Sequence, residues 1–213
     1  MNTSTKPSDE NTKRARPERT ILSIDAMGGD EGPAAVVAGI ALFARKAENV
    51  GFILHGPKKT LAPLLAKRKS LTGLVEIRDV RDVVSMEDKP SQVVRSGKST
   101  SMWSAIEAVR NKEASVCVSC GNTGALMAMS MIRLRKLPGV YRPAIAILWP
   151  SRSDQGFNVM LDVGADIRAD AKDLLQYALM GVSYARNGLS LKRPRVMQLL
   201  FAFVLFGADI QQP

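Results

Sequence analysis

Three short apolar runs in this 213-residue chain each end in a glycine-rich turn. They are TILSIDAMGGDEGP (20–33), VCVSCGNTG (116–124) and NVMLDVG (158–164). Asp, Asn or Thr stands beside the glycines, and the missing Cβ lets backbone N–H groups come close to an anion. Ligands of open α/β sheets bind outside the carboxyl ends of the strands, so these junctions predict a phosphate-handling crevice along one sheet edge.

The chain between residues 20 and 195 alternates strand-like and helix-like segments, which predicts an α/β fold with a mostly parallel sheet and flanking helices. Residues 151–156 are too few for a crossover helix, so the strands around them are expected to pair antiparallel and make the sheet mixed. Expected strands are 20–25, 50–56, 75–80, 114–120, 144–149 and 157–163. Expected helices start at Pro33 (with Val36, Ile40, Phe43 and Ala47 on one face) and span 57–69, 101–111, 123–136 and 170–187, while 89–101 is a polar loop or broken helix.

The net charge of +10 and the calculated pI of 9.9 favour anionic partners. Lys and Arg are scattered along the chain, and aromatic residues make up only 5% of it, so few side chains are available to stack on nucleic-acid bases. We therefore expect no nucleic-acid partner. Residues 1–19 are polar and carry both charge signs, which predicts a disordered tail, and the apolar stretch 199–206 is too short to span a bilayer.

Two motifs favour structural over catalytic roles. Cys117 and Cys120 form a C-x-x-C, but no second pair or nearby His completes a metal shell, so we expect two small buried strand residues and no metal site. So few cysteines fit a reducing cytoplasm. His55 is the only histidine, and no activated nucleophile accompanies it, which disfavours a Ser-His or Cys-His hydrolase.

The turn at 119–124 places Asn122 and Thr123 at the start of a helix, where the dipole and unpaired amides favour phosphate or an oxyanion. A plain Asn/Thr helix cap explains the same residues equally well. Asp25 and Asp30 would repel an anion and are expected to orient loops or basic side chains. Candidate basic groups come from a segment that otherwise reads as a solvated loop: Lys89, Arg95 and Lys98.

A reaction that needs phosphate positioning and oxyanion stabilisation without histidine is the attack of inorganic phosphate on an acyl thioester. Phosphate is already a nucleophile at neutral pH, and a thiolate with a pKa near ~8.5 is a good leaving group. The protein then has to hold both reactants in line and to stabilise charge on the carbonyl oxygen.

The chain resembles the bacterial phosphate acyltransferases of phospholipid synthesis over residues 20 to about 196. The segments that carry the resemblance are IDAMGGDEGP (24–33), MEDKPSQVVRSGKSTSMWSAIEAV (86–109), CVSCGNTGALMAMS (117–130), LDVGADI (161–167) and LLQYALMGVSYA (174–185). The resemblance implies formation of acyl phosphate from acyl-acyl carrier protein and inorganic phosphate, with no cofactor. It also implies a fold similar to isopropylmalate dehydrogenases and phosphotransacetylases, and a homodimer. The enzyme would be cytoplasmic and associated with the inner face of the membrane, and its product would pass to a membrane glycerol-3-phosphate acyltransferase.

Carried onto this sequence, the resemblance gives a set of phosphate- or acyl-phosphate-binding residues and three catalytic candidates. The binding residues are Gly28, Gly29, Asp30, Lys98, Gly121, Asn122, Thr123, Gly124, Asp162 and Gly164. The catalytic candidates are Lys89, Arg95 and Asn122.

The resemblance stops after about residue 196, so we expect a disordered tail (1–19), a partial acyltransferase domain (20–196) and a divergent apolar segment (197–213). A truncated or frameshifted gene would explain this pattern. Two alternatives remain open at this point: an inactive remnant that at most binds acyl carrier protein, and a phosphotransacetylase-type enzyme that uses acyl-CoA.

Overall fold

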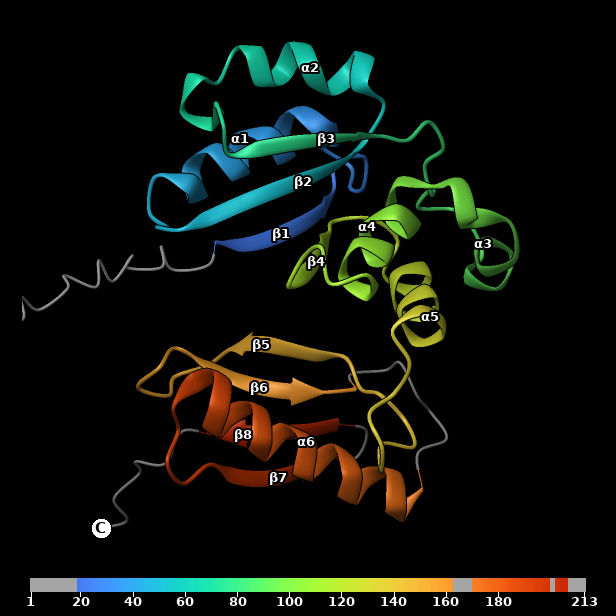
Figure 1. Ribbon diagram of the computed structural model, residues 1–213. Coiled ribbons are helices and arrows are strands. Elements are labelled where there is room, and N and C mark those ends of the chain that lie inside the picture. The colour runs from blue at the N-terminus through green and yellow to red at the C-terminus, as the bar shows by residue number, and fades with distance from the viewer. Residues whose placement is uncertain (1–18, 163–169, 200–201, 207–213) are drawn as a thin grey trace, which may run out of the picture. The chain divides into compact units, whose positions relative to one another are not determined.

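The computed structural model describes residues 19–162, 170–199 and 202–206 (Figure 1). The chain divides into two compact units, Met1–Arg135 and Lys136–Pro213, although the sequence suggested one α/β domain over 20–196.

The first unit is built on a parallel four-stranded sheet with the order β3-β2-β1-β4. The strands are β1 (Thr20–Asp25), β2 (Val50–Gly56), β3 (Val75–Asp79) and β4 (Val116–Ser119). Because all four run in the same direction, their carboxyl ends share one edge, and Asp25 of β1 is in register with both His55 and Ser119. The glycine turns that follow β1 and β4 therefore start side by side.

The described residues of this unit form five α-helices: α1 (Gly32–Ala44), α2 (Lys58–Ala66), α3 (Pro90–Ser96), α4 (Ser101–Arg110) and α5 (Thr123–Arg133). Of these, α3 and α5 pack against each other, and α5 packs on α4. Pro33 lies in the first turn of α1, as expected, because that position needs no N–H donor. Residues 89–101 adopt the broken-helix alternative, with α3 followed by a 3-10 turn at Gly97–Ser99. The backbone N–H of Trp103 is held by the Thr100 side chain, which caps α4.

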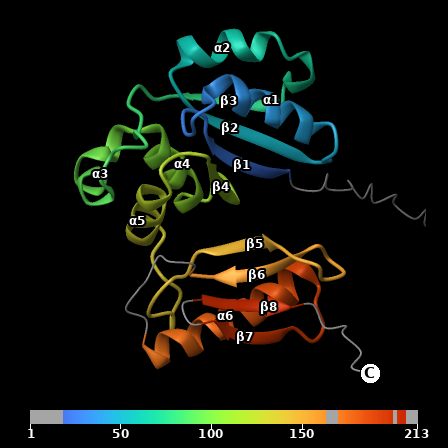
Figure 2. The same ribbon diagram turned by 180° about the vertical axis from the view of Figure 1, so that it is seen from behind.

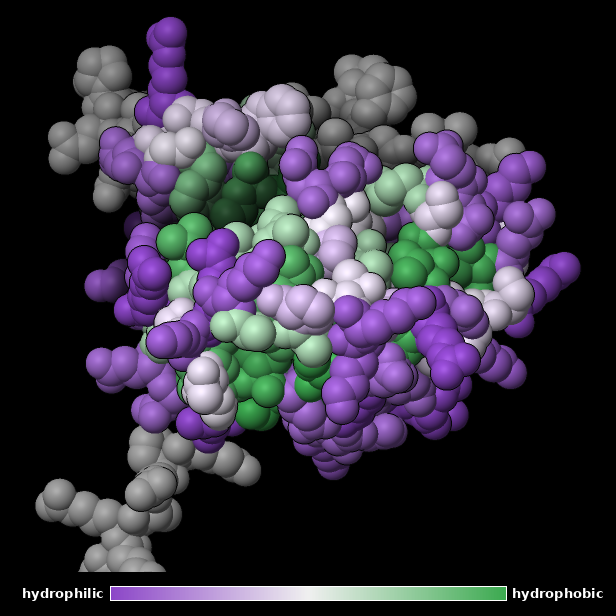
Figure 3. All heavy atoms as spheres, turned by 90° about the horizontal axis from the view of Figure 1, so that it is seen from above, coloured by the Kyte–Doolittle hydropathy of each residue, from purple (hydrophilic) through white to green (hydrophobic). Residues whose placement is uncertain are grey.

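The two faces of the sheet carry different helices (Figure 1, Figure 2). On one face, α1 and α2 bury Ile24, Phe52 and Leu54, and on the other face α4 contacts β1, β2 and β4. The outward side of α2 is largely hydrophilic, with apolar atoms visible between the polar side chains (Figure 3). Val36, Ile40 and Phe43 lie on one side of α1 as predicted, and Phe43 contacts Phe52 edge-on although it stays 47% exposed. Val37 and Ala41, which the prediction did not include, are also buried.

The second unit holds an antiparallel sheet with the order β5-β6-β8-β7, packed against one long helix. Its elements are β5 (Ala146–Pro150), β6 (Phe157–Leu161), α6 (Ala171–Leu189), β7 (Arg195–Leu199) and β8 (Ala202–Phe206). Asp170 caps α6 as predicted, and it forms a reciprocal capping box with Asp173. The core of this unit gathers around Tyr177, Val159 and Leu161.

The α/β class is confirmed, and β5 and β6 pair antiparallel as expected. The parallel and antiparallel strands lie in two separate sheets, however, and not in one mixed sheet. Short connections at β5–β6 and β7–β8 allow only antiparallel pairing, and none of these four strands pairs with β1 to β4. Gly164 and the predicted tail, except Arg19, lie outside the described residues. None of the described helices is long and apolar enough to cross a bilayer.

His55 has the structural role expected for it. Its ring is fully buried beside α4, with Nε2 2.8 Å from the Ser23 hydroxyl and Nδ1 2.8 Å from the Ser104 hydroxyl. Burial, helped by the nearby positive charge of Arg78, lowers the pKa of His55 to about 4. The imidazole is therefore neutral at physiological pH and ties β1 and β2 to α4.

This depressed pKa predicts a stability loss in mild acid. An unfolded His takes up a proton near pH 6.5, whereas the folded one resists until about pH 4, so the free energy of unfolding falls as pH drops between these values. We expect the His55 part of this loss to be about 2 kcal/mol. The His55 contribution is the difference between the pH dependences of the wild type and His55→Gln, measured by urea unfolding between pH 7 and 4.5, because the carboxylates titrate in both proteins. Parallel pH profiles for the two proteins would contradict the assignment.

Candidate active site at the glycine turns

The turns after β1 and β4 pack backbone against backbone. A Cβ built on Gly28 would lie 2.6 Å from the Gly121 nitrogen and 2.9 Å from the Gly121 Cα. A Cβ on Gly121 would in turn lie 3.2 Å from the Gly28 Cα. The next residue, Gly29, has a φ of +96° and lies against Cys120. The sequence-predicted meeting of the first and second glycine turns is therefore present. Glycine is required at position 28, and a Cβ at position 121 would be tightly packed.

A buried carboxylate fixes the two turns in place. Asp25 is 2% exposed; its Oδ1 accepts a hydrogen bond from the Ser101 hydroxyl (2.7 Å) and its Oδ2 one from the Ser119 hydroxyl (2.8 Å). The Met27 N–H also points to Oδ1, at 3.3 Å. Asp25 thus links β1, the start of α4 and the end of β4, which agrees with its expected role of orienting loops.

The Ser119 hydroxyl connects Asp25 to the second glycine turn. Its Oγ accepts a hydrogen bond from the Gly121 N–H at 3.0 Å while its own proton goes to Asp25. The Gly121 amide is therefore used within the protein, and Gly121 contributes a close backbone approach, not a free donor. The sequence could not indicate this, because it depends on the direction of one hydroxyl group.

Asn122 acts as a helix cap and also as a clamp on a distant segment. Its Oδ1 accepts from the Ala125 N–H at 3.0 Å, which caps α5. Its side-chain NH₂ donates to the backbone carbonyls of Ser85 (3.3 Å), Met86 (3.0 Å) and Asp88 (2.9 Å). The cap interpretation is thus correct but incomplete, because the same amide holds the loop that precedes α3.

Replacing Asn122 by alanine is expected to lower the free energy of unfolding by about 2 kcal/mol, since the helix cap and a side-chain donor to three carbonyls are lost together. Asn122→Asp keeps the cap acceptor but turns a carboxylate toward those carbonyls, so it should destabilise at least as much at pH 7. Thr123→Ala is the control, because this neighbouring side chain is exposed. Equal unfolding midpoints for Asn122→Ala and Thr123→Ala in urea would refute the clamp.

Several amides at the paired turns have no partner in the structure. Within the described residues, no hydrogen bond is found for the N–H groups of Gly28, Gly29, Thr123 and Gly124. Thr123 and Gly124 form the first turn of α5, where the helix dipole favours negative charge. Gly28 is buried, and a buried amide without a partner is uncommon in proteins. These groups can receive the oxygens of phosphate or an oxyanion.

Only part of the predicted basic segment is placed at these turns. A Cβ on Gly124 would lie 2.8 Å from Pro90 Cγ, so the residue after Lys89 packs on the start of α5. Gly97, in contrast, packs against Met129 of α5 and has no close contact with Gly28 or Gly121. Lys89, Arg95 and Lys98 are exposed and form no ion pair within the part of the chain that is described, so their charges remain available.

The remaining predicted site residues are placed as follows. Asp30 is exposed after the first glycine turn. Asp162 belongs to the second unit, where it is buried with a φ of +57° and its N–H donates to the Ile145 carbonyl at 2.8 Å. Gly164 lies outside the described residues.

The expectation of two buried strand cysteines is half correct. Cys117 lies in β4, and burial, together with the charge of Asp25, raises the pKa of its thiol to about 12. Cys120 follows the strand and is exposed beside Gly29. No group of three or more His, Cys, Asp or Glu side chains suited to a metal ion gathers anywhere in 19–162 or the other described ranges.

An apolar groove of about 620 Å³ begins at the first glycine turn and runs between α1 and strands β1 and β4. Gly28, Gly29 and Ser119 lie at its polar end. Its apolar lining comes from Leu22, Ile24, Val36, Ile40, Phe43, Phe52 and Val118. This groove was not predicted from the sequence, although the alternating apolar residues in 116–118 were the available signal.

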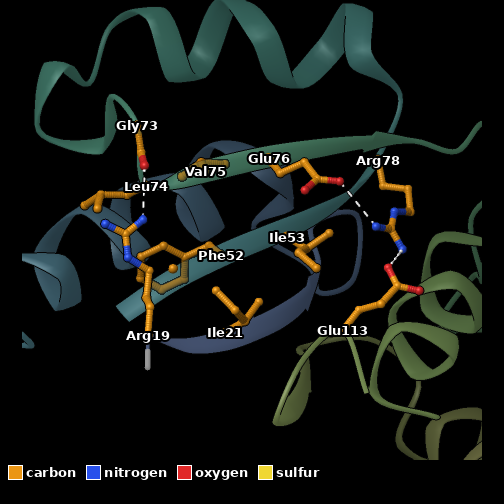
Figure 4. Close-up of a pocket in the computed structure, with 11 residues that line it drawn as sticks. Arg19, Ile21, Phe52, Ile53, Gly73, Leu74, Val75, Glu76, Arg78 and Glu113 are labelled. Atoms are coloured by element: carbon orange, nitrogen blue, oxygen red, sulfur yellow. Dashed lines mark hydrogen bonds and ion pairs between the residues drawn. The ribbon is translucent and has the colours of Figure 1, made fainter. Parts of the chain in front are cut away.

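A second pocket, of about 380 Å³, is lined by charged side chains that are paired with one another (Figure 4). Arg78 forms ion pairs with Glu113 at 2.7 Å and Glu76 at 3.2 Å, and Arg19 donates to the Gly73 carbonyl at 3.3 Å. The hydrogen bond from Arg78 holds the pKa of Glu113 below its usual value. Because these charges are already paired, the pocket offers little to an ionic ligand.

The fold and the paired turns define an α/β protein whose glycine turns meet at the carboxyl ends of two neighbouring parallel strands. Comparison with known proteins gives the family: residues 20–202 match the family described as "Fatty acid synthesis protein", and the chain belongs to it.

Three curated relatives, each named "Phosphate acyltransferase", support this assignment. The protein of Ruegeria sp. (strain TM1040) is 72% identical over 183 residues, which is 86% of this chain and 49% of the relative. That of Ruegeria pomeroyi is 69% identical over 189 residues (85% and 51%), and that of Roseobacter denitrificans 71% over 178 residues (84% and 50%). The chain therefore spans about half the length of the curated relatives it matches.

Proposed function

We propose that this chain carries the phosphate-binding part of an acyltransferase that makes acyl phosphate from acyl-acyl carrier protein and inorganic phosphate for phospholipid synthesis. The observation that carries the proposal is the contact between Gly28 and Gly121, beside which unpartnered amides from two turns gather. The name shared by the relatives supports the reaction class.

The proposed chemistry needs positioning and charge stabilisation and no histidine. An oxygen of phosphate attacks the thioester carbonyl carbon, the C–S bond breaks, and the electron pair leaves with the thiolate of the carrier. Amides of Gly28, Gly29 and the first turn of α5 bind the phosphate or the developing oxyanion. The exposed cations Lys89, Arg95 and Lys98 are the candidate groups that balance the phosphate charge.

The partners follow from the same proposal. The net charge of +10 suits an acidic carrier protein and an anionic membrane surface. We include in the proposal a homodimer, a cytoplasmic location with peripheral attachment to the inner face of the membrane, and transfer of the product to a membrane glycerol-3-phosphate acyltransferase.

The test is trapping of acyl phosphate with hydroxylamine, using the 213-residue chain and a hybrid in which the unmatched half of the Ruegeria sp. relative follows residue 196. Acyl-acyl carrier protein and acyl-CoA are supplied in separate reactions. We expect product from the carrier-bound donor in the hybrid. Product only from acyl-CoA supports the phosphotransacetylase alternative, and carrier binding by the 213-residue chain without any product in either protein supports the inactive remnant.

A further inference from the structure

We infer that Lys89 is the cation that pairs with the phosphate substrate, and that Asn122 is the positioning residue that holds Lys89 at the second glycine turn. This assignment rests on the proposed function, because the anion at the glycine turns is taken to be phosphate. The other two candidate cations, Arg95 and Lys98, then have no direct part in binding. All of these residues belong to the first unit, so nothing in the assignment involves the second unit.

The backbone of Lys89 is held on both sides by contacts with the amino end of α5. Before it, the Asp88 carbonyl accepts a hydrogen bond from the Asn122 side-chain NH₂ at 2.9 Å. After it, the ring of Pro90 packs against Gly124, where a Cβ would lie 2.8 Å from Pro90 Cγ. Consecutive Cα atoms are about 3.8 Å apart, so Lys89 has to lie beside the first turn of α5.

Asn122 acts on this site through the loop and not by contact with a ligand. The residue is only 8% exposed, and its NH₂ also donates to the carbonyls of Ser85 and Met86. Its Oδ1 is used as the cap of α5. The loop that it holds is closed by a hydrogen bond from the Ser85 N–H to Asp88 Oδ2 at 2.8 Å. Both polar ends of the Asn122 side chain are therefore occupied within the protein, and its effect on phosphate has to pass through Lys89.

The Lys89 side chain has the charge and the freedom that this role needs. It is exposed, and it forms no ion pair in the described part of the chain. The amides of Thr123 and Gly124 supply donors, but the amino end of a helix carries only roughly half a unit of positive charge. Phosphate has more negative charge than that, so a full cation beside the same turn is required, and a flexible lysine ammonium provides it.

The backbones of the other two cations are placed further from this turn. Lys98 follows Gly97, which packs against Met129, five positions beyond Gly124 in α5 and so a rise of about 7.5 Å along the helix. Arg95 lies in the last turn of α3, about 7.5 Å along that helix from the proline that contacts α5. We therefore expect both to attract phosphate more weakly than Lys89 does.

The test of Lys89 is the phosphate affinity of the 213-residue chain, measured through its backbone amide NMR signals. Lys89→Gln should weaken binding by about tenfold, whereas Lys89→Arg keeps the charge and should bind within about threefold of the wild type. Lys67→Gln is the matched control, because Lys67 is an exposed lysine at the C-terminal end of α2, and it should leave the affinity unchanged. If Arg95→Gln or Lys98→Gln weakens binding as much as Lys89→Gln, the assignment of Lys89 is wrong.

The positioning role of Asn122 is tested with Asn122→Ser, which keeps an oxygen for the helix cap and removes the NH₂ group. This variant should weaken phosphate binding by about threefold while Lys89 is present. In the double variant Lys89→Gln/Asn122→Ser the loss should be no larger than in Lys89→Gln alone, because both changes act on the same cation. Wild-type affinity in Asn122→Ser, or a double variant whose loss is the product of the two single losses, overturns the positioning role.

Kinetics of the hybrid protein separate this inference from the proposed function. There, Lys89→Gln should raise the KM for phosphate by about tenfold and leave the KM for acyl-acyl carrier protein nearly unchanged. Lys89-dependent phosphate binding without acyl phosphate formation contradicts the proposed function alone. Product formation with an unchanged KM for phosphate in Lys89→Gln contradicts the role of Lys89 alone, and the absence of both phosphate binding and product contradicts both.

Discussion

Alanine in place of Asp25 is expected to lower the free energy of unfolding by about 3 kcal/mol, because hydrogen bonds to a charged acceptor are among the stronger ones. The substitution removes the acceptor of the Ser101 and Ser119 hydroxyls and leaves both donors without their partner in a buried region. It also frees the Ser119 hydroxyl that holds the Gly121 amide, so the second glycine turn should loosen. Urea unfolding measures the first effect, and hydrogen exchange at Gly121 measures the second.

The control is Asp30→Ala, which removes a carboxylate from the same loop at an exposed position. It should change the free energy of unfolding by no more than about 0.5 kcal/mol. If the two alanine variants unfold at the same urea concentration, the hydrogen bonds of Asp25 with Ser101 and Ser119 do not contribute to the free energy of unfolding.

Gly28→Ala is expected to cost roughly 3 kcal/mol and to weaken phosphate binding, because the new Cβ would overlap backbone atoms that have little freedom to move. The Gly121 nitrogen and Cα lie only 2.6 and 2.9 Å from that Cβ position, so one turn must shift away from the other. Urea unfolding and a phosphate titration of the same samples measure the two effects.

Gly39→Ala is the matched control for this substitution. Gly39 lies within α1, and a Cβ there meets nothing within 4 Å. Alanine is the better helix former, so this variant should be unchanged or more stable by up to about 1 kcal/mol. A Gly28→Ala protein as stable as Gly39→Ala would mean that the two turns are not packed backbone to backbone.

Local sequence patterns located the elements of the fold well. The strand signal at 20–25 coincides with β1, and Asp170 caps α6 as its position suggested. The patterns failed where the outcome depended on contacts between distant residues. The burial of each side chain on α1 is set by the sheet beneath it, so Val37 is fully buried while Phe43 stays half exposed in the groove. The grouping of strands into two sheets follows from which strands pair.

The candidate site divides in the same way. Glycine, Asn and Thr in 119–124 indicated either an anion-binding turn or a plain helix cap, and the structure places that turn against Gly28. The bonds from Asn122 to Met86 and Asp88 cross more than thirty positions of the chain, and no local pattern reports them. The link from Asp25 to Ser101 is likewise a consequence of the fold.

The anion site at the two packed glycine turns is tested by a titration of the isotope-labelled 213-residue chain with inorganic phosphate, followed through its backbone amide NMR signals. If the amides at these turns form one anion site, the Gly28, Gly29, Thr123 and Gly124 signals will shift in a saturable way. These shifts should be retained in Gly39→Ala and reduced in Gly28→Ala. Shifts confined to exposed lysine-rich surfaces, or identical titrations of the two variants, would contradict a single anion site at these turns.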